Sequence, residues 1–272
     1  KKIPRKWLRP ALGVTAAMIV LPILLITQPW SVSLGPQSVM AEAYTATEGL
    51  QSYRTSSSLV SIFEGETSEQ RSEWEFAFPG RYHGRITLDS EIYEFIIIEE
   101  KTYARDPDDA SGKLSIGVRS AFAPSKEYTL EILDSLTGLQ KLPDEKIEST
   151  DCLHYRGKAD VEREIEKQQA KLDPEQPGYE ERLKGLDALR TIETEVELWI
   201  GKDDFLIRQM KSIMESSVHG NAVVVVKFYD FNEAITIEPP TAESGELLPG
   251  WRLQSSPQNQ QERTFSSDVS FT

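Results

Sequence analysis

Few residues in this chain have the types and spacing that chemistry requires. The three histidines, His83, His154 and His219, stand far apart and have no acidic or cysteine neighbour at the spacing of a metal-ligand set. Cys152 is the only cysteine, so no disulfide can form within the chain. No Gly-x-Ser-x-Gly, glycine-rich phosphate loop or paired cysteine and histidine occurs. The sequence therefore predicts no enzyme and no cofactor, and it favours surface or edge-strand histidines over a zinc site.

Carboxylates are abundant, and one group of them could hold a cation. Asp106, Asp108 and Asp109 could bind a weak calcium ion through several oxygens, and Asp203 and Asp204 form a second acidic pair. No EF-hand spacing follows either group. We therefore expect solvated acidic turns and no metal.

The charge distribution excludes nucleic acid as a partner. The formal net charge is -14, although five basic residues fall within the first nine positions, as Lys1, Lys2, Arg5, Lys6 and Arg9. The rest of the chain is therefore more acidic than the total indicates. An acidic surface repels phosphate backbones, and no local basic patch offsets it.

The basic N-terminus precedes an apolar segment. Residues 10–27 are uncharged and lie between Trp7 and Trp30. About 18 to 20 such residues cross a bilayer core, and aromatic flanks suit the two interfaces. We expect a single-pass anchor in a bacterial cell membrane, with the N-terminus inside and the body outside. The alternative is a secretory signal cleaved near residues 41–43, but its apolar core would be about 7 to 15 residues long.

Beyond a linker, at residues 31–37, the pattern becomes that of a mixed α and β domain. Residues 38–53 carry apolar side chains at helical spacing. A second helix is expected over 125–139, with Ser125 as its N-cap, followed by a strand around Cys152. Strand-like runs separated by turn residues are expected at residues 54–66, 72–80, 81–90 and 91–106.

The strand-like runs alternate between apolar and polar residues. Trp74, Phe76 and Phe78 fall on one face, and Glu73 and Glu75 fall on the other. Such alternation is typical of a sheet with one buried and one wet surface. The short links favour antiparallel connections.

A charged stretch at residues 159–190 interrupts these runs. It predicts two surface helices, inserted before the last strands. Turns at residues 201–204 and 220–221 then indicate two closing hairpins.

This organisation resembles the lipoprotein-carrier superfamily typified by LolA, LolB and the mycobacterial lipoproteins LppX and LprG. Three segments carry the resemblance: FAFPGRYHGRI at 76–86, VELWIGKDDFLIRQM at 196–210 and FYDFNEAITIEPP at 228–240. The resemblance covers about residues 38–240. The chain departs from the pattern because no cysteine follows the apolar segment and because the 159–190 insertion has no counterpart.

The resemblance implies an α+β fold, a strongly curved antiparallel sheet of about ten strands that forms a half-open β-barrel. Helices would lie on its concave face, and an N-terminal transmembrane helix would precede it. The expected organisation is a basic N-terminus and anchor at 1–30, a linker at 31–37, a lipid-binding domain at 38–245 and a disordered tail at 246–272.

The implied function is binding of a lipid or lipidated protein, with acyl chains in the apolar concavity. The alternative is an envelope sensor of the same fold that contacts a protein partner, as in the branch of the family that regulates anti-sigma factors. The same side chains could instead fill a core beneath the helices. The candidate ligand-binding residues are Trp74, Phe76, Phe78, Phe95, Ile97, Val196, Leu198 and Ile200.

Overall fold

A computed structural model describes residues 35–88, 90–105, 124–176, 178–216 and 220–254. The chain divides into the units Lys1–Gly35 and Pro36–Thr272, and the fold described below is that of the second unit. The membrane helix expected within residues 10–27 lies outside the described residues. Among the helices that are described, none combines the length and the apolar character needed to cross a membrane.

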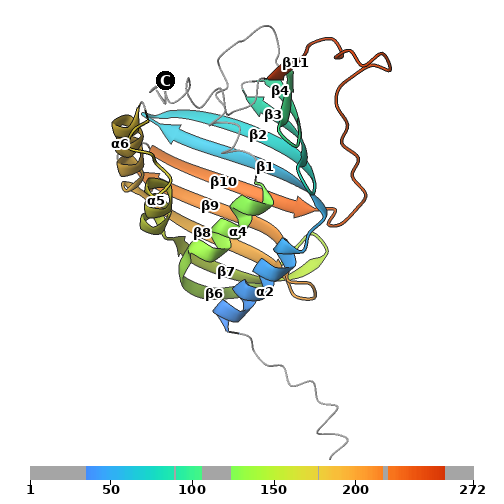
Figure 1. Cartoon of the computed structure of the whole chain (residues 1–272). Coiled ribbons are helices and arrows are strands. Elements are labelled where there is room, and N and C mark those ends of the chain that lie inside the picture. The colour runs from blue at the N-terminus through green and yellow to red at the C-terminus, as the bar shows by residue number, and fades with distance from the viewer. Residues whose placement is uncertain (1–34, 89, 106–123, 177, 217–219, 255–272) are drawn as a thin grey trace, which may run out of the picture. The chain divides into compact units, whose positions relative to one another are not determined.

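The described strands form one antiparallel sheet of eleven strands (Figure 1). Their order across the sheet is β11-β5-β4-β3-β2-β1-β10-β9-β8-β7-β6, so β11 and β6 are its two edges and the sheet is open. In chain order the strands are β1 (Ser52–Phe63), β2 (Glu66–Ala77), β3 (Arg81–Leu88), β4 (Glu91–Ile98), β5 (Lys101–Arg105), β6 (Leu136–Ile147), β7 (Thr150–Ala159), β8 (Ile192–Gly201), β9 (Ile207–Ser216), β10 (Gly220–Tyr229) and β11 (Trp251–Gln254).

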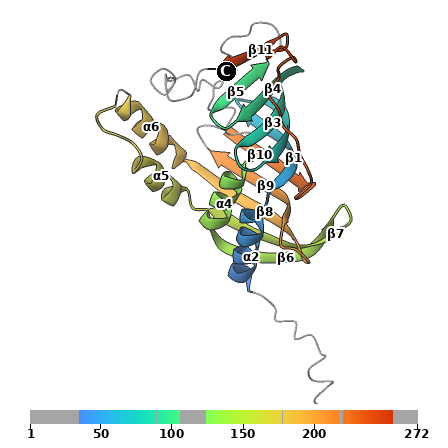
Figure 2. The same cartoon turned by 45° about the vertical axis from the view of Figure 1, so that its right-hand side comes forward.

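Two helices lie on one face of this sheet, which we call the inner face (Figures 1 and 2). They are α2 (Pro36–Glu48) and α4 (Lys126–Ser135), and they pack against each other. The α4 helix begins where the sequence predicts, because the Ser125 hydroxyl accepts a hydrogen bond of 3.2 Å from the Tyr128 amide. This N-cap contact satisfies one of the free amides of the first turn.

The predicted helical insertion is also present, between β7 and β8. It consists of α5 (Val161–Gln169) and α6 (Tyr179–Leu189). The Asp160 carboxylate caps α5 by accepting from the Arg163 amide at 3.0 Å. No residue of α6 is buried, so this helix contributes little to the core.

The register of the strands determines which side chains share the inner face. Residues directly opposite each other in antiparallel strands point to the same side of the sheet. Tyr53, Phe76, Tyr82 and Ile97 are paired in one row across β1 to β4. The alternation predicted in β2 is confirmed, since Trp74 and Phe76 are buried while Glu73 is exposed.

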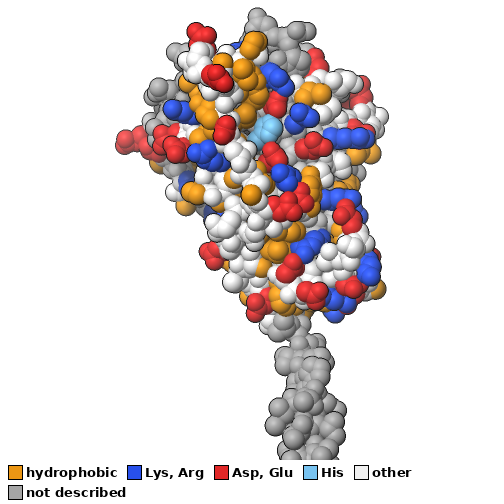
Figure 3. Space-filling model, turned by 90° about the vertical axis from the view of Figure 1, so that its right-hand side faces the viewer, with side chains coloured by type: hydrophobic (Ala, Val, Ile, Leu, Met, Phe, Trp, Pro, Cys, Tyr) orange, Lys and Arg blue, Asp and Glu red, His pale blue; other side chains and the backbone are white. Residues whose placement is uncertain are grey.

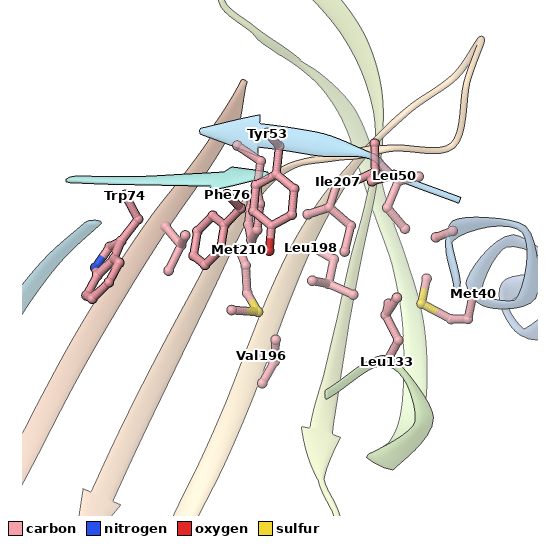
Figure 4. Close-up of a cluster of buried hydrophobic side chains, with 14 of the residues drawn as sticks. Met40, Leu50, Tyr53, Trp74, Phe76, Leu133, Val196, Leu198, Ile207 and Met210 are labelled. Atoms are coloured by element: carbon pink, nitrogen blue, oxygen red, sulfur yellow. The ribbon is translucent and has the colours of Figure 1, made fainter. Parts of the chain in front are cut away.

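The hydrophobic core forms where this inner face meets the two helices. Figure 4 shows side chains from the helices and from the sheet pointing toward one another. Met40 of α2 and Leu133 of α4 belong to the same cluster as Leu198, Ile207 and Met210. The core thus joins segments from both ends of the chain.

Two elements differ from the sequence-based prediction. The expected helix over 125–139 stops at Ser135, and Leu136–Ile147 forms the edge strand β6. This strand contains Gly138 and Pro143, which weaken a strand pattern, and its register is irregular. The prediction of a disordered tail from residue 246 was wrong for Trp251–Gln254, which pair with β5 as β11. Residues 255–272 lie outside the described ranges.

Candidate functional site

The structure brings the sequence-predicted site residues to one face of the sheet. On β2 to β4, Trp74 is opposite Gly84 and Gly84 is opposite Phe95. Residues of β8 are connected to this group through the strands between them. The residues opposite one another in β8, β9, β10, β1 and β2 form a continuous row from Leu198 of β8 to Ser72 of β2. Because Ser72 and Trp74 are two positions apart in one strand, the β8 residues share a face with the β2 residues. Sequence alternation alone could not establish this link between distant strands.

Most of these residues lie deep in the core. Six of the eight are at most 2% exposed, namely Trp74, Phe76, Phe95, Val196, Leu198 and Ile200. Phe78 and Ile97 are half-buried. For the six buried residues, packing in the hydrophobic core is the role that the described contacts display.

A cluster of aromatic rings occupies the end of the inner face where α4 begins. The ring of Tyr53 stacks on Phe76 with centroids 4.6 Å apart and contacts Phe78 at 5.7 Å. Tyr82 meets Phe76 edge-on at 5.5 Å. The Tyr53 hydroxyl donates to the Pro124 carbonyl at 3.0 Å, and burial raises the pKa of this phenol. The tyrosine remains protonated and ties the start of α4 to the sheet.

Sequence reasoning missed several apolar residues of the inner face. Among them, Leu59, Leu88, Met214 and Val224 are only partly buried. Leu59 is opposite Val224, and both Leu59 and Leu88 are opposite Gln70. Alternation along each strand could have placed them, but only the register shows that they continue the wall formed by the predicted residues.

Trp74 depends on the glycine opposite it. An added Cβ at Gly84 would lie closer than 3.0 Å to three carbons of the Trp74 ring. The indole therefore lies across β3 in space that only glycine leaves open. Its Nε1 is buried and has no hydrogen-bond partner.

The opposite, outer face carries a row of acidic, basic and histidine side chains that we call the outer-face ladder. Arg54 donates to Asp230 at 2.8 Å and to Glu75 at 2.7 Å. The His83 nitrogens Nδ1 and Nε2 lie 3.2 Å from Glu75 and 2.8 Å from Glu94. The members in order across the strands are Asp230, Arg54, Glu75, His83, Glu94 and Arg105.

The ladder changes the acidity of one of its carboxyl groups. Partial burial alone would raise the pKa of Glu75. Hydrogen bonds from Arg54 and His83 outweigh burial and hold the pKa of Glu75 below its ordinary value. A space-filling view shows acidic and basic side chains interspersed around a histidine on one face of the molecule (Figure 3).

The second described histidine has a similar setting on β7. The His154 ring stacks on Trp199 with centroids 4.2 Å apart. Its two nitrogens lie 3.6 Å from carboxylate oxygens of Glu145 and Glu197, on the strands to either side. The residue is 5% exposed and its strand is internal.

The expectation of surface or edge-strand histidines is therefore wrong for His154. His83 also lies on an internal strand. The carboxylates that face both rings come from neighbouring strands, so sequence spacing could not reveal them.

Metal and thiol chemistry receive no support from the described part of the chain. Within those ranges, no group of three or more His, Cys, Asp or Glu side chains is arranged to hold a metal ion. The acidic turn at Asp106–Asp109 and His219 fall outside them. Cys152 is buried, and burial raises the pKa of its thiol, so it stays protonated and weakly nucleophilic.

Comparison with known proteins yields structural matches. No family model matches the sequence, and no curated protein matches it. The lipoprotein LppX of Mycobacterium tuberculosis is 15% identical, with a TM-score of 0.45, over 75% of this chain and 100% of its own. LprF of Mycobacterium bovis is 14% identical, with a TM-score of 0.46, over 76% of this chain and 97% of its own.

A complex of MucA and MucB from Pseudomonas aeruginosa is matched at 10% identity and a TM-score of 0.35, over 84% of this chain and 60% of the matched chain. No residue role in this chain is taken from any of these matches.

Proposed function

We propose that this chain is an extracytoplasmic binding protein for a lipid or a lipidated protein, whose acyl chains lie against the inner face of the sheet. The proposal includes a tether, formed by residues 10–27, to a bacterial cell membrane. It includes no catalytic step, because burial of acyl chains is sufficient for binding.

The observation that carries this proposal is the mismatch between the inner face and the two helices on it. Eleven strands of about ten residues form a surface of roughly 48 by 33 Å, about 1,600 Å². Helices of 13 and 10 residues cover about 350 Å² between them. Curvature of the sheet reduces the difference but does not remove it. Much of the inner face therefore lies beyond the reach of α2 and α4.

Partly buried apolar residues of the inner face supply a wall for acyl chains. Leu59, Leu88, Met214 and Val224 are partly buried and lie on the inner face. Each methylene moved from water to such a wall contributes about 0.8 kcal/mol. An acyl chain of about 14 carbons can therefore bind without any ionic contact.

A pair of neighbouring valines in β10 allows a direct test. Val224 points to the inner face and Val225 to the outer face, and both are partly buried. Val224→Trp would fill space on the inner face, whereas Val225→Trp makes the same change on the other side. The full chain is purified from a bacterial membrane fraction, and bound lipid is quantified by native mass spectrometry and by extraction.

We expect the native chain and Val225→Trp to retain lipid, and Val224→Trp to lose about tenfold in lipid uptake from vesicles. Unfolding in urea shows whether the two variants keep similar stability. A native chain that carries no lipid and takes up none from vesicles would contradict the proposal.

The exposed α6 helix favours a second candidate, an interaction module that contacts a protein partner. Glu180 and Glu181 lie in its exposed first turn. Glu162 of α5, in contrast, pairs with Arg190, so its reversal would disturb the insertion itself. Reversing Glu180 and Glu181 to lysine should abolish partner binding while lipid content stays unchanged. Equal co-purification of envelope proteins with both forms would rule out this surface.

A further inference from the structure

A line of polar side chains runs along β1 and β2 on the inner face. Thr55 and Ser57 of β1 lie beside Trp74 and Ser72 of β2, and Gln70 follows in the same strand. We call these five residues the β1–β2 seam. A hydrogen bond of 2.7 Å joins the hydroxyls of Ser57 and Ser72.

Apolar residues border this seam on both sides. Ile86 and Leu88 of β3 lie opposite Ser72 and Gln70. On the other side, Phe228 and Val226 of β10 lie opposite Thr55 and Ser57. The inner face therefore presents a polar seam between two apolar walls.

Three polar atoms of the seam are buried without a hydrogen-bond partner. They are Thr55 Oγ1, Gln70 Nε2 and Trp74 Nε1. The three residues are 0%, 5% and 2% exposed. A buried donor left unpaired destabilises a folded chain by about 1–3 kcal/mol. Three such atoms along one strand pair require an explanation outside the chain's own hydrogen bonds.

The chemistry of these atoms restricts what could satisfy them. The indole and amide nitrogens only donate, and the threonine hydroxyl can donate as well. They therefore match acceptor oxygens. No inner-face residue of β1 between Tyr53 and Phe63, or of β2 between Ser68 and Phe76, carries a charge. An anionic group held there would lack a counter-ion and would lose its hydration.

We infer that the β1–β2 seam binds the uncharged acceptor oxygens of a lipid, such as ester carbonyls, while acyl chains lie on the walls to either side. This inference rests on the proposed lipid-binding function and adds a preference for the polar part of the ligand. The seam then selects uncharged linkages over anionic head groups.

A competition between two lipids tests this preference. The full chain is incubated with phosphatidylcholine vesicles that contain equal amounts of dioleoylglycerol and dioleoylphosphatidylglycerol. These two lipids share their acyl chains and differ in the anionic group. The ratio of the two lipids bound to the protein is then measured by extraction and mass spectrometry.

We expect the native chain to prefer dioleoylglycerol by about tenfold or more. Thr55→Val and Gln70→Leu each remove one donor while keeping similar volume, and each should reduce the amount of dioleoylglycerol bound by about threefold to tenfold. Ser58→Val is the matched control, because Ser58 lies on the same strand but points to the outer face. It should leave that amount unchanged.

The outcomes separate the seam from the proposed function. If both lipids bind in equal amounts, and the amounts are unchanged in Thr55→Val and Gln70→Leu, the inferred role of the seam is refuted while the lipid-binding function stands. A preference for the anionic lipid would also refute that role. If neither lipid binds, both the proposed function and the inferred role of the seam are refuted.

Discussion

Replacing Gly84 by alanine tests the packing of Trp74 most directly. Gly84 has no positive φ, so alanine can adopt its backbone conformation. The new methyl group would lie closer than 3.0 Å to Trp74 Cε3, Cζ3 and Cη2. Because the indole is 2% exposed and stacks with Phe76 at 6.1 Å, it has little room to move away. The substitution must therefore displace the ring or separate β2 from β3.

Two opposing effects set the magnitude. Overpacking of a dense core destabilises by about 1–3 kcal/mol, and the rigid ring places this clash near the upper end. Removing a glycine restricts the unfolded chain and stabilises by about 0.4–1 kcal/mol. The net loss in the free energy of unfolding should be about 2 kcal/mol. For a domain of this size, that loss corresponds to a decrease in Tm of roughly 4–8 °C.

Urea unfolding followed by far-UV circular dichroism measures this loss, and a double-mutant cycle assigns its cause. In a Trp74→Leu background the ring is absent, so Gly84→Ala should no longer destabilise. Gly185→Ala serves as the control, because Gly185 lies in α6 with nothing within 4 Å of an added Cβ. It should stabilise α6 by up to about 1 kcal/mol. A Gly84→Ala chain as stable as the native one, or an equal loss with and without Trp74, would refute the argument.

Three further predictions follow from the same structure. Thr55→Val should leave the lipid-free chain at least as stable as the native one in urea, because a same-shaped apolar group replaces an unpaired hydroxyl; a loss of about 2 kcal/mol would indicate a hidden partner. Ser125→Ala should destabilise by about 1 kcal/mol through loss of the α4 cap, and an unchanged unfolding midpoint would show that the cap is dispensable. The pKa of Glu75 is lower in the folded chain than its ordinary value of 4.5, so its stabilising contribution is present above about pH 4.5 and is lost as the pH falls through the folded pKa. Glu75→Gln should therefore flatten the acid limb of a stability-against-pH profile, and parallel profiles for the two chains would contradict this assignment.

The sequence predicted the inner face where one strand carried a strong alternating pattern. Trp74 and Phe76 could be assigned to one side of β2 because glutamates separate them. Leu198 and Ile200 also fell on that face, but the connection between β8 and β2 passes through three intervening strands. Pairing across those strands depends on register, which a single sequence does not specify.

The features that sequence reasoning missed share this dependence on pairing. Gln70 and Thr55 look like ordinary strand residues until pairing places them beside apolar neighbours on the inner face. His83 likewise meets carboxylates that are 8 and 11 positions away in the chain. The β6 strand was missed for a different reason, because its glycine and proline obscure the strand pattern and exposure leaves it little alternation.

The pairing of β1 with β10 has a consequence for the order in which the sheet can form. Strands β1 to β5 follow one another as neighbours, as do β6 to β10, so each half can assemble from local contacts. Within the described sheet, strands of the two halves pair only where β1 meets β10, and there Arg54 binds Asp230, 176 positions later. During synthesis β1 therefore remains an unpaired edge until nearly the whole domain has emerged. The run of three serines at 56–58 makes the centre of this unpaired strand polar. This polarity disfavours pairing with other chains before β10 has been synthesised.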